Sequence, residues 1–157
     1  MGRLYSVEFE NVTVTASQDF FEISPADDKP CRIVGLFLSQ NSDKGDAEEE
    51  FMRWRIIRGH ATSGSGGSAA TPRPINPTDV AASFAAEVNN TTIASAGTAV
   101  NLHSDSFNIR SGLGLWIPEN CWWECSQGAG VIIVVRLMAA PADALSMSGT
   151  LYVREDG

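Results

Sequence analysis

The amino-acid sequence predicts an all-β fold: a single antiparallel β-sandwich, jelly-roll-like, with about eight strands, one short helix and a long Gly/Ser/Pro-rich loop. Short segments of alternating apolar and polar residues recur along the chain, and clusters of turn residues separate them. No strand-helix-strand rhythm typical of a parallel sheet is present. The chain has 157 residues, 43% of them hydrophobic, which fits one globular domain over residues 1–157.

Two segments in the first part of the chain predict strands of different kinds. Residues 7–14 alternate, but their apolar positions change parity around Glu10 and Asn11, as happens where a bulge or corner bends a strand. Residues 31–38 are apolar at almost every position, which is typical of a central strand covered on both faces. We therefore expect a bent first strand and a buried central strand after it.

Residues 51–57 predict a strand with one buried face and one basic face. Apolar side chains, Met52 and Trp54 among them, occupy one face, while Arg53 and Arg55 occupy the other. Guanidinium groups in such a stripe can bind an acidic partner surface, although an ordinary solvated face explains the same pattern. Arg53 and Arg55 are therefore candidate protein-interface residues.

The next stretch combines chain breakers with signals of a helix. Residues 61–77 contain a Gly/Ser run and three prolines, too many breakers for a regular element, and predict a flexible loop. Asn76 and Pro77 then offer a helix cap and a first helical position, and apolar residues follow at helical spacing up to Val88. One short helix is expected here, ending near Asn89.

The last third of the chain predicts a return to strands. Apolar parity changes again between Leu102 and Phe107, so a bend is expected there. Residues 131–138 form the most hydrophobic run, which is too short to span a membrane. Residues 145–153 alternate between apolar and polar side chains, as the closing strand of a hairpin does.

Residues 122–125 predict a further short strand, and it contains adjacent tryptophans. Trp122 and Trp123 must point to opposite sides of such a strand, so one can join the core while the other needs a cover. A tryptophan left exposed on a small β-protein indicates a subunit interface, another protein or a sugar ring. Trp122 and Trp123 are therefore candidate interface residues, in addition to the two arginines.

Charge and hydropathy argue against several classes of partner. Nineteen acidic residues against eleven basic ones give a net charge of −8, which argues against nucleic acid and anionic membrane surfaces. No apolar run is long enough for a membrane span, and residues 1–8 lack the apolar core of a secretory signal. We expect synthesis in the cytoplasm and no nucleic-acid or membrane partner.

The sequence offers few groups for catalysis or metal binding. The three cysteines, Cys31, Cys121 and Cys125, show no metal-ligand spacing, and without an export signal we expect free thiols. His60 and His103 are the only histidines, which is too few for a cupin-like metal site. No cofactor, metal ligand or catalytic residue is predicted, and a small metal-dependent enzyme is the minor alternative.

Several motifs along the chain form a recognisable set. They are Arg-Gly-His-Ala-Thr-Ser-Gly-Ser-Gly-Gly at 58–67, Thr-Pro-Arg-Pro at 71–74, Asn-Asn-Thr-Thr at 89–92, Ala-Ala-Pro-Ala-Asp-Ala at 139–144 and Ser-Gly-Thr-Leu-Tyr-Val at 148–153. Together they resemble a family of small proteins encoded by tailed bacteriophages and prophages, over nearly the whole chain. The resemblance carries over no site residues, because it includes no defined site motif.

This resemblance implies a non-enzymatic virion structural protein. Small β-sandwich proteins in virions are typically decoration or cement proteins, which bind the major capsid protein on the head lattice and often form trimers. A homo-oligomer on the capsid surface is therefore expected, made in the host cytoplasm. A virion module that binds a host receptor or glycan, and a head-tail or tail component, stay open as alternatives.

Overall fold

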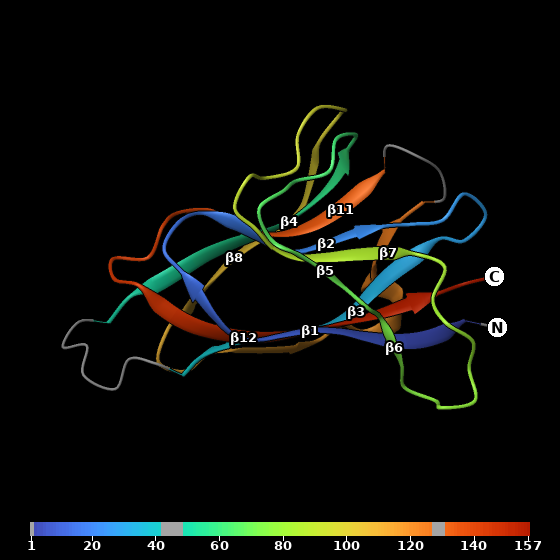
Figure 1. The fold of residues 1–157 in the computed structure, drawn as a ribbon, viewed down its shortest axis with the longest axis horizontal. Coiled ribbons are helices and arrows are strands. Elements are labelled where there is room, and N and C mark those ends of the chain that lie inside the picture. The colour runs from blue at the N-terminus through green and yellow to red at the C-terminus, as the bar shows by residue number, and fades with distance from the viewer. Residues whose placement is uncertain (1, 42–48, 127–130) are drawn as a thin grey trace.

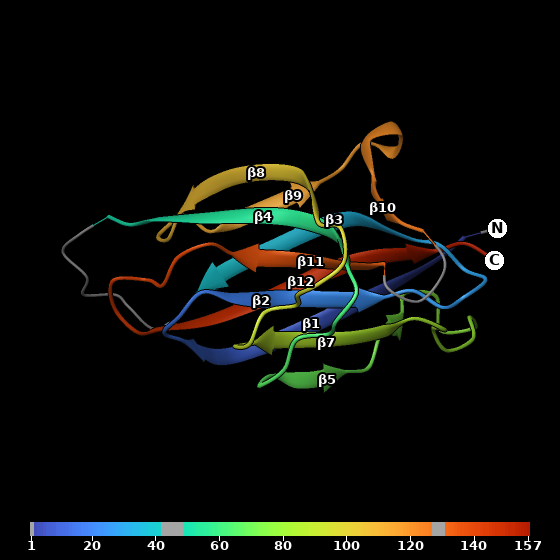
Figure 2. The ribbon, with the colours of Figure 1, turned by 90° about the horizontal axis from the view of Figure 1, so that it is seen from above.

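Two six-stranded antiparallel sheets face each other in the computed structural model, which describes residues 2–41, 49–126 and 131–157 (Figure 1 and Figure 2). The first sheet contains β1 (Arg3–Val14), β3 (Cys31–Gln40), β6 (Arg73–Pro74), β9 (Leu113–Trp116), β10 (Trp123–Cys125) and β12 (Leu145–Glu155). The second contains β2 (Gln18–Ser24), β4 (Phe51–His60), β5 (Ser68–Ala70), β7 (Ala85–Asn90), β8 (Val100–Asn108) and β11 (Ile132–Leu137). The predicted all-β antiparallel sandwich is confirmed, with twelve strands in the described residues instead of about eight.

The strand order places β3 and β12 inside the first sheet. That sheet runs β10-β3-β12-β1-β6, with β9 also paired with β3, and the second runs β5-β7-β2-β11-β4-β8. β1 and β12 pair along nearly their whole length, with Arg3 opposite Glu155, so β1 begins where β12 ends (Figure 1). β3 thus lies inside the sheet, as its continuous apolar run predicts, but it is not covered on both faces, since Phe37 is half-buried and Ser39 is exposed.

The two sheets meet through the alternating apolar positions that the sequence predicts. Every second residue of β12 is buried, and Phe9 of β1 packs on Phe20 and Phe21 of β2, with ring centroids 6.1 and 5.2 Å apart. Met52 and Trp54 of β4 are buried as predicted. Burial of a side chain of this size stabilises the fold by about 1.5–3 kcal/mol.

Both predicted changes of parity are β-bulges. In β1 the register shifts between Phe9 and Val12, where Asn11 has a φ of 53° and its N–H donates to Ser148 Oγ at 3.1 Å. In β8 the register with β4 skips Leu102. Because one extra residue exchanges the two faces of a strand, each bulge accounts for the shift of the apolar pattern.

The predicted short helix after Asn76 is wrong, because no α-helix occurs in the described residues and a loop leads from there into β7. Asn76 does make the hydrogen bond of a capping residue, because its Oδ1 accepts the N–H of Thr78 at 3.2 Å. No helical turns follow this bond. Phe84, Ala86 and Val88 are buried at a spacing of two, which is the period of a strand. Pairing with β2 therefore overrides the helical spacing.

The Gly/Ser/Pro-rich segment contains regular elements, so the expectation of none in residues 61–77 is wrong: β5 and β6 lie within it. Its first part pairs with the segment after β7 through two isolated bridges, Thr62 with Ser95 and Ser65 with Thr92. Prolines and glycines prevent long strands here, yet they leave enough backbone donors and acceptors for short pairings.

Buried charged side chains hold these two loop segments against the second sheet. Glu22 of β2 accepts a hydrogen bond from Ser63 Oγ at 2.5 Å. Asp19 and Arg136 form a buried ion pair, with Asp19 Oδ1 2.6 Å from Arg136 Nε, and both side chains bind the backbone of Ala94. The loops consequently cover part of the outer face of the second sheet.

Candidate interaction surface

Three aromatic side chains gather on the outer face of the first sheet. Gly35 of β3 pairs with Tyr152 of β12 on one side and with Trp116 of β9 on the other. Phe37 adds a third ring, whose centroid lies 5.3 Å from that of Trp116 and 6.0 Å from that of Tyr152. The Trp116 and Tyr152 centroids lie 4.8 Å apart. We call Phe37, Trp116 and Tyr152 the aromatic platform.

Two glycines make room for the aromatic platform. A Cβ atom at Gly35 would lie 2.7 Å from the Trp116 ring, and one at Gly114 would lie 3.2 Å from the Phe37 ring. The Trp116 and Phe37 rings therefore lie directly over the backbone of the two glycines. Such a close approach is a common reason for an isolated glycine within a strand. Trp116 stays 59% exposed, so the platform has an open apolar edge.

A groove of about 610 Å³ lies beside the platform and shares Phe37 with it. Its lining carries hydroxyl and carboxyl groups from three strands of the first sheet: Glu8, Glu10, Ser39, Ser148 and Thr150. Carboxylates accept hydrogen bonds, whereas hydroxyl groups both donate and accept them. The groove can therefore bind hydroxyl or amide groups of another molecule.

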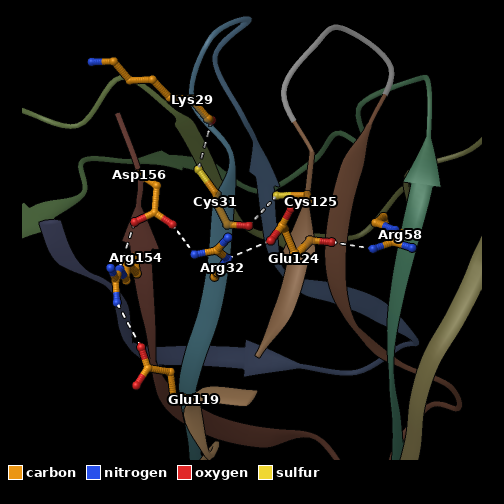
Figure 3. Close-up of polar contacts among 9 residues, drawn as sticks. All are labelled: Lys29, Cys31, Arg32, Arg58, Glu119, Glu124, Cys125, Arg154 and Asp156. Atoms are coloured by element: carbon orange, nitrogen blue, oxygen red, sulfur yellow. Dashed lines mark hydrogen bonds and ion pairs between the residues drawn. The ribbon is translucent and has the colours of Figure 1, made fainter. Parts of the chain in front are cut away.

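A network of ion pairs joins β3, β10 and the end of β12 (Figure 3). Its Arg154 lies two residues after Tyr152 of the platform on β12. Arg32 Nε is 2.7 Å from a Glu124 oxygen and Arg32 also pairs with Asp156, while Arg154 Nε is 2.9 Å from Asp156. The hydrogen bond to Glu124 raises the pKa of Arg32. Because these groups are partly exposed, the network adds little stability. The ion pairs instead hold two arginine and two carboxylate side chains in fixed positions.

The two tryptophans predicted as interface residues take different positions. Trp123 packs against the core, with its ring centroid 6.3 Å from that of Trp54. Trp122 is partly buried, donates its Nε1–H to the Ile117 carbonyl at 2.8 Å, and lies beneath a guanidinium group. Trp123 is thus half-buried against the core and Trp122 is covered, but Trp122 precedes β10 and lies outside the strand, contrary to the prediction. The most exposed tryptophan is Trp116.

The two predicted arginines lie on the other sheet. Arg53 and Arg55 of β4 pair with Ser106 and Ser104 of β8. Together with Asp105 they line a pocket of about 260 Å³. The structure therefore does not bring the four predicted interface residues into one site, since Trp123 belongs to the first sheet, with Trp122 just before it, and the arginines belong to the second. A role of either pair in an interface stays a prediction.

The histidines take separate structural positions. His60 Nδ1 lies 3.3 Å from the Ala96 carbonyl oxygen, and the His103 ring centroid lies 5.0 Å from that of Trp54. Across residues 2–41, 49–126 and 131–157, no three His, Cys, Asp or Glu side chains cluster so that they could hold a metal ion. Nor does that part of the chain contain a helix with the length and apolar character needed to cross a membrane.

Sequence reasoning missed the aromatic platform, although two signals for it exist. Gly35 interrupts the apolar run of β3, and Gly114 precedes Trp116 by two residues, so both mark strand positions where a ring can approach the backbone. The register that brings Tyr152 beside them is not visible in the sequence.

No family model, curated protein or solved structure matches the chain.

Proposed function

We propose that this chain is a non-enzymatic virion structural protein that binds the outside of a tailed-phage capsid as a decoration or cement protein. The observation that supports this most directly is the aromatic platform, held on a rigid sheet with Trp116 59% exposed. Tryptophan and tyrosine are enriched where proteins contact each other. The resemblance to small phage proteins supplies the virion context.

The charges around the platform are consistent with a protein partner. Arg32 and Arg154 are paired with Glu124 and Asp156, so the rim is polar and the centre apolar. This is the usual layout of a protein–protein interface. The net charge of −8 favours a partner surface that is neutral or basic, because like charges repel during approach.

Self-association would strengthen attachment to a lattice. A homo-oligomer such as a trimer places several platforms on a capsid at once. After the first platform binds, the others bind within the same complex, which raises the overall affinity. Individually weak contacts can in this way hold the oligomer on the lattice. The major capsid protein is the partner that we propose for this arrangement.

Capsids assembled from the major capsid protein of the same phage are expected to bind the purified chain and to become more resistant to heat and osmotic shock. Co-sedimentation measures binding, and the temperature at which particles release their contents measures resistance. Particles that bind the chain without any gain in resistance would contradict the cementing role. Particles that do not bind it would contradict attachment to the capsid.

A second candidate, binding of a host glycan, is favoured by the groove beside the platform. Sugar rings pack on aromatic faces, and their hydroxyl groups bind carboxylates such as Glu8 and hydroxyls such as Thr150. A glycan array probed with the purified chain tests this candidate, and Glu8→Gln is expected to weaken any signal. A blank array counts against it.

A further inference from the structure

Two buried cysteines face each other at the edge of the first sheet. Cys125 of β10 pairs directly with Cys31 of β3, and each is only 1% exposed. Cys125 Sγ lies 3.5 Å from the Cys31 carbonyl oxygen, and Cys31 Sγ lies 3.9 Å from the Lys29 carbonyl oxygen. Figure 3 shows the Cys125 sulfur directed at the Cys31 carbonyl oxygen and the Cys31 sulfur directed at Lys29.

Directly opposed residues of antiparallel strands have the spacing that a disulfide requires. Their Cα atoms lie roughly 4.5–5.5 Å apart, inside the range of about 4.4–6.8 Å found in disulfides. The two thiols also interact: a hydrogen bond with the Cys125 side chain, together with burial, raises the pKa of Cys31. Bond formation therefore needs rotation of the side chains and little backbone movement.

We propose that Cys31 and Cys125 form a cross-strand disulfide when the protein meets a small-molecule disulfide such as oxidised glutathione. The bond would tie β10 covalently to β3. This site is separate from the aromatic platform and does not depend on what the platform binds.

The reaction is two successive thiol–disulfide exchanges. The Cys125 thiolate attacks one sulfur of oxidised glutathione, forming a mixed disulfide and releasing one glutathione thiolate. The Cys31 thiolate then attacks the Cys125 sulfur and releases the second glutathione thiolate. Two cysteine thiols are oxidised and one glutathione disulfide is reduced, and the two cysteine protons pass to the released glutathiones.

Access to the pair is controlled by β10, which is three residues long and lies at the edge of the sheet. Glu124 holds it in place, because its side chain accepts from Arg32 and its carbonyl accepts from Arg58 Nη1 at 2.7 Å. While β10 is closed, the raised pKa of Cys31 keeps that thiol protonated. Short edge strands open more readily than core strands, so we expect oxidation to proceed through this opening.

The test uses the full chain carrying Cys121→Ser, which removes the exposed thiol and leaves the buried pair. Incubation with oxidised glutathione is expected to lower the intact mass by about 2 Da, and peptide mapping should link Cys31 to Cys125. The two residues are 94 positions apart, so the bond closes a long loop. We expect a melting temperature higher by roughly 10 °C, and dithiothreitol should reverse the change.

Adding Cys31→Ser to this background is expected to abolish the loss of mass and to leave at most a glutathione adduct on Cys125. Two thiols that can still be alkylated after prolonged oxidation, with no linked peptides, would overturn the proposal. A link that lowers the melting temperature would also overturn it, because a well-placed bond stabilises the fold.

The route through the opening of β10 has its own test. Arg58→Ala removes the hydrogen bond to the Glu124 carbonyl and is expected to speed oxidation about fivefold. Arg55→Ala, on the same strand, is the matched control and should leave the rate unchanged. Equal rates in the two variants would rule out this route.

Discussion

Replacing Asp19 with alanine is expected to lower the free energy of unfolding by about 3–5 kcal/mol and the melting temperature by roughly 10 °C. The Asp19 carboxylate is fully buried and binds Arg136 Nε at 2.6 Å and Nη2 at 3.1 Å. Without it, Arg136 stays buried with no counter-ion, and the N–H of Ala94 loses its acceptor. Urea unfolding followed by circular dichroism measures the loss.

Asp105→Ala is the matched control for this stability prediction. Its side chain is 55% exposed and lies 3.8 Å from His103, so its removal should cost less than about 1 kcal/mol. In a double-mutant cycle, Arg136→Ala is expected to lose much less stability once Asp19 is already absent. Equal losses for Asp19→Ala and Asp105→Ala would show that the buried pair does not anchor the loops.

Replacing Trp116 with serine is expected to weaken binding to the capsid by about 30-fold or more, the effect of removing an interface hot spot. Trp116 supplies the exposed edge of the aromatic platform, and its ring lies outside the core between the sheets. The fold should therefore persist, which circular dichroism can verify. Co-sedimentation with capsids over a range of concentrations measures the affinity.

Two further variants distinguish the effect of losing the aromatic platform from the effect of losing any exposed apolar side chain. Phe51→Ser removes an aromatic side chain that is 65% exposed on the second sheet, and it should leave the affinity unchanged. Gly35→Ala keeps Trp116 but places a Cβ atom 2.7 Å from its ring, so it should reduce the affinity and shift tryptophan fluorescence. Equal affinities for Trp116→Ser and Phe51→Ser would refute the role of the platform.

Strands that bury one face could be predicted from the sequence. The alternation in β12 and β4 is a local consequence of burying every second residue, and the structure confirms it. The bulge at Glu10 and Asn11 was also visible, because one extra residue shifts the apolar pattern within a single segment. Such features need no knowledge of the partner strand.

The strand over residues 84–88, most of which is β7, could not be predicted in this way, because its apolar residues fit two periods. Phe84 and Val88 are four residues apart, which suits one face of a helix and equally one face of a strand. Ala86, between them, is also buried and pairs with β2, so the segment forms a strand and not a helix. Its partner is distant in the sequence, so local propensity was outweighed by tertiary pairing.

The candidate site shows the same limit. Trp116 and Tyr152 come from distant strands and meet only because both pair with Gly35 of β3. Adjacent Trp122 and Trp123 were easier to notice, since two neighbouring tryptophans stand out in the sequence, although only Trp123 lies within β10. Predicting the platform would have required the registers of β9 and β12 against β3, which depend on the packing of the whole sheet.

A reconstruction of phage particles carrying this chain tests the central claim most directly. The account predicts that the chain lies on the capsid, with Phe37, Trp116 and Tyr152 buried against the major capsid protein and with the second sheet farther from the lattice. A reconstruction with these three rings facing solvent, or with the chain in the tail or the head-tail connector, would contradict the account.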